Sequence, residues 1–441
     1  MHTIPKVFRL LSRSLDDLIS RRNQFCLHPG SDFTRSRKLP LRSLLLFLIS
    51  MDDQSLRDEL VHFFQLTQSL PSRSALVQQR KKLSPLALAF LLHSFNRYSH
   101  RLSRNSKRWG FHLVACDGSD ITSVGYPQDA DSFFYVASHK VGYNMLHVST
   151  VFDLCTHQFL DALIHSKRFA NERNDLLALV DRQSYLPRNT VWIADRGYES
   201  FEVLFRMQAQ HRYYVIRAQD INGNGTLCRL FGIPEQGEYD VQRSLSLTAN
   251  RKLAKKDPIH FHWFREIKRM PEWDPIQRPC LPLSFRVIRY EDKGNWYVLL
   301  TNLPKTRAST AVVKQMYQLR WDIEKAYRDT KYPAALKALH TKKTEFVQQE
   351  IYAKLLMYNI CKLIQQLLES ESAPASHPTQ YRYQLNFTHL VRTIRRYIRS
   401  PDRQTLSDVM ASIMRQWIPV RPGRHAERGP ISYGPIPLNY R

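Results

Sequence analysis

Residues 111–117 read FHLVACD, a run that is apolar apart from His112 and that ends on an aspartate. A short, nearly continuous apolar run of this kind favours a strand buried on both faces of a sheet. Residues 190–195, TVWIAD, repeat the pattern and end on a second aspartate. We therefore expect Asp117 and Asp195 to end two buried strands.

The segments around these two strands predict a mixed α/β sheet. Residues 144–153 and 158–165 favour a hairpin, 171–182 and 199–209 favour helices, and 213–217, 285–290 and 296–303 favour further strands. Strands that come first in series and then alternate with helices are typical of such a sheet.

Changes in composition and in hydrophobic pattern divide the chain into six regions. Residues 218–283 carry a turn cluster, alternating segments and several prolines, which predicts a β-rich insertion. It separates two parts of the core, 111–217 and 284–332. The regions 1–110 and 333–418 have helical patterns, and 419–441 form an extended basic tail rich in Pro, Gly and Arg.

The charge of the chain is strongly positive and unevenly placed. Its 441 residues include 65 Lys and Arg against 39 Asp and Glu, a formal net charge of +26. Residues 1–110 hold 19 basic and 7 acidic residues and residues 332–441 hold 16 and 7, whereas the residues between hold 30 and 25. This layout favours a polyanionic partner held by both ends of the chain, most often nucleic acid, although solvated basic faces are the plain alternative.

Other features narrow the class of protein. No apolar run approaches the ~18 residues of a membrane-spanning helix, and residues 1–17 lack the apolar core and cleavage site of a secretory signal. We therefore expect a soluble protein that is not exported and has no membrane partner.

Residues 72–83, SRSALVQQRKKL, favour either the second helix of a DNA-reading helix pair or a solvated helix face.

A long helix is predicted from about 309 to 330, since Pro333 prevents it from continuing far beyond 331. At about 100° per residue, Tyr317, Arg320, Glu324 and Lys331 fall within roughly 60° of one another. An apolar face formed by other residues can pack against the sheet. Its members are Val312, Met316, Leu319, Ile323 and Ala326.

Three carboxylates from two strands and one helix suit two-metal phosphoryl transfer. Asp117, Asp195 and Glu324 would repel one another unless divalent cations neutralised them. Ligation by oxygen alone favours two Mg²⁺ or Mn²⁺ ions. Asp120 lies three residues after Asp117 and is an alternative first ligand, but Asp117 directly ends the apolar run.

The spacing Tyr317-x2-Arg320-x3-Glu324-x6-Lys331 matches the signature of the insertion-sequence-4 family of DDE transposases at all four positions. The contexts of the two aspartates, ACDGSD (115–120) and ADRGYES (194–200), also resemble motifs of that family. The resemblance covers roughly residues 110–332. It implies an RNase H-like core with a β-strand insertion, and Asp117, Asp195 and Glu324 as catalytic metal ligands.

The resemblance also implies roles in DNA binding. Tyr317, Arg320 and Lys331 take the positions that contact DNA near the cleaved end in the family. Trp296 lies 21 residues before Tyr317, where relatives carry a tryptophan that stacks on a flipped base.

The expected function is cut-and-paste DNA transposition. The chain would bind terminal inverted repeats, cleave the transposon ends and transfer the 3′-hydroxyl strand to target DNA, as a homodimer on DNA. We expect it in the bacterial cytoplasm, associated with the nucleoid. The alternatives are an RNase H-like nuclease and a domesticated or inactive transposase that acts as a DNA-binding protein.

Overall fold

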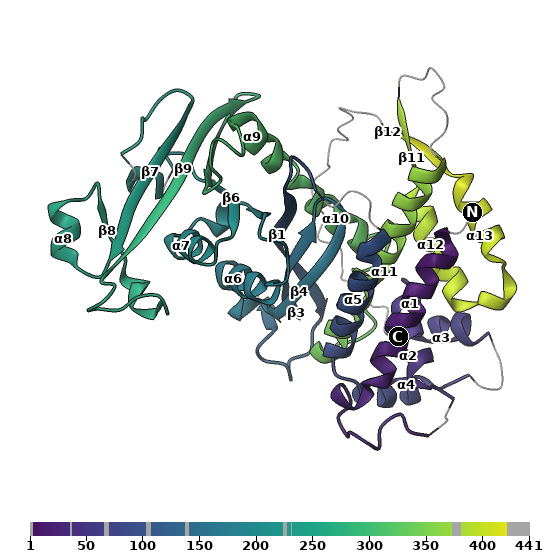
Figure 1. Cartoon of the computed structure of the whole chain (residues 1–441). Helices are drawn as coiled ribbons and strands as arrows, with labels where there is room; N and C mark the ends of the chain where they lie inside the picture. The colour runs from purple at the N-terminus through teal and green to yellow at the C-terminus, as the bar shows by residue number, and fades with distance from the viewer. Residues whose placement is uncertain are drawn as a thin grey trace.

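The computed structural model describes residues 3–35, 38–65, 70–102, 107–136, 141–223, 227–230, 232–372 and 381–420. The body of the molecule is a long mixed sheet, and helices from both ends of the chain gather beside it (Figure 1). The predicted basic tail from 419 on lies outside the described residues apart from its first two positions.

One ten-stranded sheet runs through the molecule in the order β2-β3-β1-β5-β6-β10-β9-β7-β8, with β4 paired to β3. Its strands are β1 His112–Val124, β2 Phe133–Val136, β3 Val141–Asp153, β4 Gln158–Ser166, β5 Thr190–Ala194, β6 Tyr213–Ala218, β7 Tyr239–Thr248, β8 Phe261–Trp263, β9 Cys280–Asp292 and β10 Asn295–Thr301.

Five of these strands form the RNase H-like core. β4, β3 and β1 are antiparallel neighbours, and β1, β5 and β6 are parallel neighbours. The three antiparallel strands thus lead into two parallel strands that follow a helix each, which is the RNase H-like arrangement. The predicted fold class is confirmed, including the hairpin of β3 and β4.

The prediction that Asp117 ends its strand is wrong. β1 continues through Asp117 to Val124, because β3 pairs with it in unbroken register from Asp153 opposite Val114 to Tyr143 opposite Val124. A long antiparallel partner thus carries the strand past the point where its apolar pattern stops. Asp195, in contrast, directly follows the last residue of β5, as predicted.

Helices cover both faces of the core sheet. Helices α6 (Glu172–Arg182) and α7 (Phe201–Ala209) pack against the face to which Val114 and Cys116 belong. Leu113 and Ala115, on the opposite face, belong to the cluster formed by the helices from the two chain ends. Both faces of β1 are therefore buried, which explains its continuous apolar run.

The region predicted as a β-rich insertion extends the same sheet. It carries β7, the short helix α8 (Arg251–Lys256), β8 and the first residues of β9. β9 pairs with β7 along one edge and with β10 along the other. The sheet is thereby continuous from the core into the insertion, at the left of Figure 1.

The N-terminal and C-terminal regions are helical, as predicted. Their helices are α1 Thr3–Ser20, α2 Leu41–Ser50, α3 Leu56–Phe64, α4 Arg73–Lys81, α5 Leu86–Ser99, α11 Thr344–Ser372, α12 Phe387–Arg399 and α13 Leu406–Met414. The helical pattern near the C-terminal end forms two helices, because it is interrupted at Pro401 between α12 and α13. The strands β11 (Arg382–Leu385) and β12 (Trp417–Val420) flank this helix pair.

The long helix predicted over 309–330 is also divided. α9 (Thr310–Gln318) and α10 (Trp321–Lys331) are joined by a tight turn in which the amides of Arg320, Asp322 and Ile323 each bond to the carbonyl three residues earlier. Such bonds form a 3₁₀ turn, which winds more tightly than an α-helix. The predicted apolar face is nevertheless packed into the core, with Met316 and Ile323 fully buried.

Among the helices of the described ranges, none combines the length and the apolar composition that crossing a bilayer requires.

Candidate active site

The two aspartates lie on adjacent parallel strands. The register pairs Ala115 of β1 with Ile193 of β5, so Asp117 and Asp195 each lie two residues beyond this pair. The Asp195 carboxylate accepts a hydrogen bond of 2.8 Å from the amide of Gly197. The Asp117 carboxylate accepts one of 3.0 Å from the amide of Gly118. Each carboxylate is thus oriented by a nearby backbone amide, and the two lie at matching positions on neighbouring strands.

Glu324 and Arg320 bring the third carboxylate to this place. An Arg320 nitrogen donates to the Glu324 carboxylate at 2.7 Å, and another lies 4.0 Å from the Asp117 carboxylate. The Arg320 side chain is only 7% exposed. Its guanidinium therefore joins the acidic residue of α10 to the acidic residue of β1.

The charges at this site are imbalanced in favour of acid. Burial, together with the negative charges of Asp195 and Glu324, raises the pKa of Asp117 to about 7 against the opposing effect of Arg320. A carboxylate in this environment is stabilised by any additional positive charge. The other two side chains predicted as metal ligands thus act electrostatically on Asp117.

Tyr327 fixes α10 against the sheet, and the sequence offered no signal for this role. Its hydroxyl lies 2.9 Å from the carbonyl oxygen of Asp117, 3.1 Å from that of Val148 and 2.8 Å from the Thr150 hydroxyl. Tyr327 lies three residues after Glu324, on the same helix. The position of Glu324 relative to Asp117 therefore depends on this buried hydroxyl.

Asp120 belongs to a different cluster. Its carboxylate lies 2.6 Å from Nδ1 of His147 and 2.9 Å from the Lys167 ammonium. Burial disfavours its ionised form, but the hydrogen bonds from His147 and Lys167 outweigh that and hold its pKa below the usual range. Of the two aspartates in the motif, Asp117 is the one beside Arg320 and Glu324.

The carboxylates are suitable ligands for divalent ions, although their side chains are not already grouped around a common point. Within the described parts of the chain, no three His, Cys, Asp or Glu side chains are already grouped as a metal site. Oxygen donors of this kind do suit Mg²⁺ and Mn²⁺. A cation beside Asp117 would favour its ionised form, which burial and the neighbouring carboxylates disfavour.

Comparison with known proteins identifies the family. A family model described as "Transposase DDE domain" matches residues 109–360, more than half of the chain. The chain belongs to the transposase DDE domain family. The resemblance to insertion-sequence-4 transposases is thereby confirmed, and the family implies a metal-dependent enzyme that cleaves DNA.

Two individual transposases resemble the chain. "Transposase InsG for insertion sequence element IS4" from Escherichia coli (strain K12) is 24% identical over 367 residues, which are 78% of this chain and 74% of that protein. The piggyBac transposase in a synaptic complex with hairpin DNA is 11% identical, with a TM-score of 0.42 over 100% of this chain and 89% of that one.

The predicted DNA-contacting residues lie around the carboxylates in different environments. Lys331 donates a hydrogen bond of 2.6 Å to the hydroxyl of Ser119, two residues after Asp117. Tyr317 is only 2% exposed, and its buried hydroxyl has no hydrogen-bond partner among the residues that the structure describes. Its ring lies 5.8 Å from the Arg320 guanidinium.

Trp296 borders a pocket beside this transposase's second aspartate. The pocket has a volume of about 420 Å³, and Arg196 and Arg217 also line it. The guanidinium of Arg289 covers one face of the indole at 3.7 Å from the ring centroid. Arg289 is itself held by Asp220 at 2.8 Å. Arg289 thus covers one face of the Trp296 indole, and Arg196 and Arg217 lie around the same pocket.

A fourth carboxylate near the site was missed by the sequence analysis. Glu172, the first residue of α6, lies 3.4 Å from Nε2 of His147. A side chain at Gly197 would meet both the Glu172 and the Asp195 carboxylates, at 3.2 and 3.1 Å. One at Gly118 would meet His147 at 2.5 Å. A side chain at Gly118 would also meet the Glu172 carboxylate, at 2.8 Å, so both glycines leave room for Glu172 between the strands that carry Asp117 and Asp195.

Proposed function

We propose that this transposase binds the terminal inverted repeats of its element, cleaves the ends and transfers the 3′-hydroxyl strand to target DNA by two-metal phosphoryl transfer. The observation that carries the proposal is the shared electrostatic environment of Asp117, Asp195 and Glu324. All three are acidic, one is strongly desolvated, and a family of DNA-cleaving enzymes matches the surrounding chain.

Asp117, Asp195 and Glu324 are the proposed ligands of two Mg²⁺ or Mn²⁺ ions. When bound, the ions supply the positive charge that activates the attacking oxygen and stabilises the leaving oxygen. Arg320 presents a planar fork of donors between two of these carboxylates, and such a fork binds phosphate in a bidentate way.

The remaining predicted residues are proposed to hold the DNA end. Lys331 carries a point charge close to Asp117, suited to a phosphate oxygen. Tyr317 is only 2% exposed, so we propose that it acts on the DNA end through Arg320, whose guanidinium lies 5.8 Å from its ring. Trp296 has one face covered by Arg289, and stacking an extruded base on the other face contributes about 1–3 kcal/mol. We propose that two copies assemble, one on each end.

Cleavage and joining of the element's own ends test this function. The inverted repeats that flank the gene supply the substrate duplex, which is incubated with the chain and Mg²⁺. We expect end cleavage and strand joining, both lost in Asp117→Ala, Asp195→Ala and Glu324→Ala proteins and on chelation of the metal. Asp120→Asn is the matched control and should retain both steps, because Asp120 pairs with His147 and Lys167 instead.

The outcomes separate the alternatives. Cutting without joining and without preference for the ends would identify an RNase H-like nuclease. End-specific binding without any cleavage would identify an inactive transposase that acts as a DNA-binding protein. If any of the three alanine variants still joins ends, the residue that it replaces is not part of the catalytic site.

A further inference from the structure

Helix α4 is anchored on one side and exposed on the other. Its Arg80 is 2% exposed and donates to Gln349 at 3.1 Å, to Glu350 at 2.9 Å and to the carbonyl of Phe346 at 2.8 Å, all on α11. Leu76 is fully buried beside it. Because Arg80 is buried and donates to these three partners, it is not available to contact a nucleic acid.

The opposite face of α4 is exposed and free of acidic residues. The exposed side chains are Arg73, Ser74, Val77, Gln78 and Lys81. They fall within an arc of about 140° at 100° per residue. They comprise two cations, a hydroxyl, an amide and a branched apolar group. Arginine, lysine, glutamine, hydroxyl and apolar side chains are those that read base edges in the major groove of DNA.

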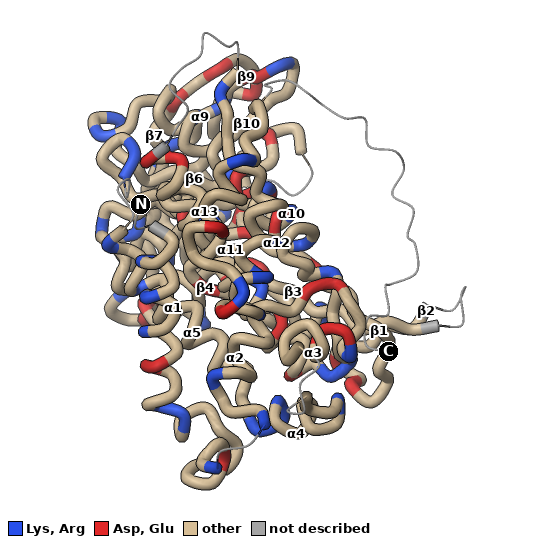
Figure 2. Tube along the Cα trace, turned by 90° about the vertical axis from the view of Figure 1, so that its right-hand side faces the viewer, with Lys and Arg blue, Asp and Glu red and all other residues tan. Residues whose placement is uncertain are grey.

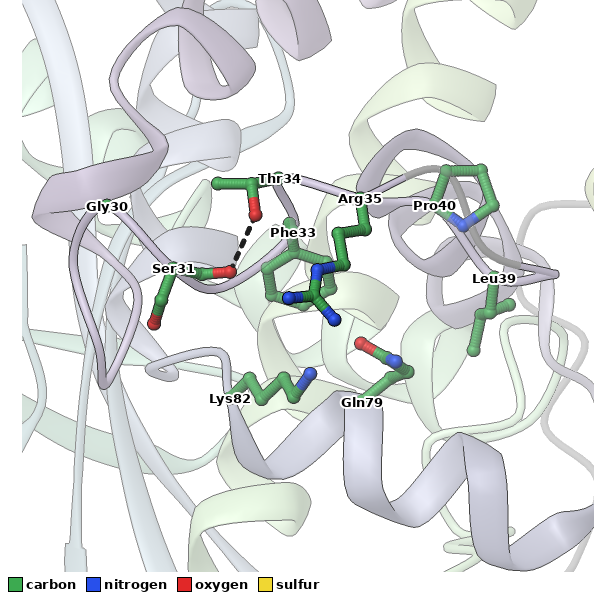
Figure 3. A pocket seen from close by; sticks show the side chains of 9 residues that line it. All are labelled: Gly30, Ser31, Phe33, Thr34, Arg35, Leu39, Pro40, Gln79 and Lys82. Atoms are coloured by element: carbon green, nitrogen blue, oxygen red, sulfur yellow. Dashed lines mark hydrogen bonds between the residues drawn. The ribbon is translucent and has the colours of Figure 1, made fainter.

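A basic pocket lies at the C-terminal end of this helix. It has a volume of about 410 Å³ and lies between α4 and the loop before α2. In Figure 3 the ends of Arg35, Lys82 and Gln79 point toward one another across the pocket. Lys82 has a long ion pair of 3.7 Å with Asp32, whereas no ion pair to Arg35 occurs within the described ranges. Two cations and an amide around one space suit a phosphate group.

The surroundings favour duplex DNA as the occupant. Residues 1–110 contain 19 Lys and Arg against 7 Asp and Glu. Figure 2 shows basic positions recurring along α1 and α4. The major groove of B-DNA is wide enough for one α-helix, and phosphate contacts at the groove edge fix its register. An exposed helix that ends at a basic pocket offers both kinds of contact.

We propose that α4 enters the major groove of the transposon end and that Arg35 and Lys82 hold a backbone phosphate beside it. This proposal rests on the proposed function, because it assigns the surface that recognises the ends. Arg73 and Gln78 read bases, whereas Arg35 and Lys82 provide contacts that do not depend on sequence.

Fluorescence anisotropy with two duplexes tests the reading role. One duplex carries the terminal inverted repeat and the other a scrambled sequence, and divalent ions are left out so that cleavage does not contribute. We expect Arg73→Ala and Gln78→Ala to weaken end binding on the order of 10-fold and to leave binding of the scrambled duplex nearly unchanged. Arg188→Ala removes an exposed arginine before β5 and should leave both affinities unchanged.

The phosphate pocket is tested with the same duplexes over a range of salt concentrations. Arg35→Ala and Lys82→Ala should weaken both duplexes by a similar factor. Each should reduce the slope of log affinity against log salt by about 1. Thermal unfolding followed by circular dichroism checks that each variant is folded. Using Arg35 as well as Lys82 guards against an effect of leaving Asp32 without its cation.

The results distinguish this proposal from the function on which it rests. If wild-type protein prefers the ends and the Arg73 and Gln78 variants keep that preference, α4 does not read the ends. If the salt slopes stay unchanged, the pocket holds no phosphate. If wild-type protein binds both duplexes equally, α4 is not an end reader and end recognition itself is contradicted. Loss of metal-dependent joining in the presence of normal end binding contradicts only the proposed catalysis.

Discussion

At the scale of single residues, Asp117 differs from an ordinary aspartate in its protonation. Burial and two neighbouring carboxylates raise its pKa from 3.8 to about 7. The folded chain therefore holds a proton on Asp117 that the unfolded chain releases near pH 4. Between these two values the folded state binds more protons, so its stability falls as the pH rises.

Asp117→Asn is expected to remove this pH dependence. In the absence of divalent ions, the variant should be more stable than wild type by up to about 4 kcal/mol above pH 7. The difference should shrink towards pH 4, where the wild-type carboxyl is neutral as well. Urea unfolding between pH 4 and pH 8 measures it. Parallel curves of unfolding free energy against pH for the two proteins would show that ionising Asp117 in the folded state costs no stability.

At the scale of elements, the placement of α10 decides the geometry of the site. The tight turn at Arg320 separates α10 from α9, and the Tyr327 hydroxyl ties α10 to the backbone of β1 and β3. Glu324 and Asp117 are 207 residues apart in sequence. One buried hydroxyl next to the carbonyl of Asp117 thus couples two distant parts of the candidate site.

Tyr327→Phe is expected to loosen this coupling. Buried acceptors left without a donor cost about 1–3 kcal/mol of stability. A small displacement of Glu324 should reduce end cleavage on the order of 10- to 100-fold. Urea unfolding and a cleavage assay measure the two effects. Tyr332→Phe, at an exposed position just after α10, is the matched control and should change neither. Unchanged cleavage in Tyr327→Phe would show that α10 is held by its apolar contacts alone.

At the scale of the whole molecule, buried polar groups join the two ends of the chain. Arg80 of α4 pairs with Glu350 of α11, and Glu350 also accepts a hydrogen bond of 3.0 Å from the amide of His340. Both members of the ion pair are almost fully buried. Burial disfavours the Glu350 carboxylate, but Arg80 and His340 outweigh this and lower its pKa to about 2.

Glu350→Gln is expected to destabilise the joined helical region. Removing one member of a buried ion pair costs roughly 3–5 kcal/mol. Because the folded-state pKa lies below the ordinary value of 4.5, the contribution of Glu350 is complete above pH 4.5 and lost as the pH falls towards 2. Unfolding free energies over this range should fall steeply for wild type and less for the variant. Glu345→Gln, exposed on the same helix, should behave as wild type. Equal acid sensitivity of Glu350→Gln and wild type would contradict this role of the pair.

Much of this architecture could be predicted, and the errors share a cause. The hairpin of β3 and β4, the strand that ends at Asp195 and the apolar face of α9 and α10 all follow from local patterns. The continuation of β1 past Asp117 depends on pairing with β3. The burial of Arg80 depends on α11, which lies more than 260 residues later in the sequence. Local periodicity does not report such distant partners.

The kind of chemistry could be inferred from the amino-acid sequence. Two aspartates after apolar runs and four residues at fixed spacing were enough to indicate the transposase family, because residue type and spacing are properties of the chain alone. Which of these groups are charged or accessible depends on the folded molecule. It set Asp117 apart from Asp120, and it buried Arg80 while leaving Gln78 exposed. Charge and accessibility depend on what packs around a side chain, and packing is settled only when distant segments meet.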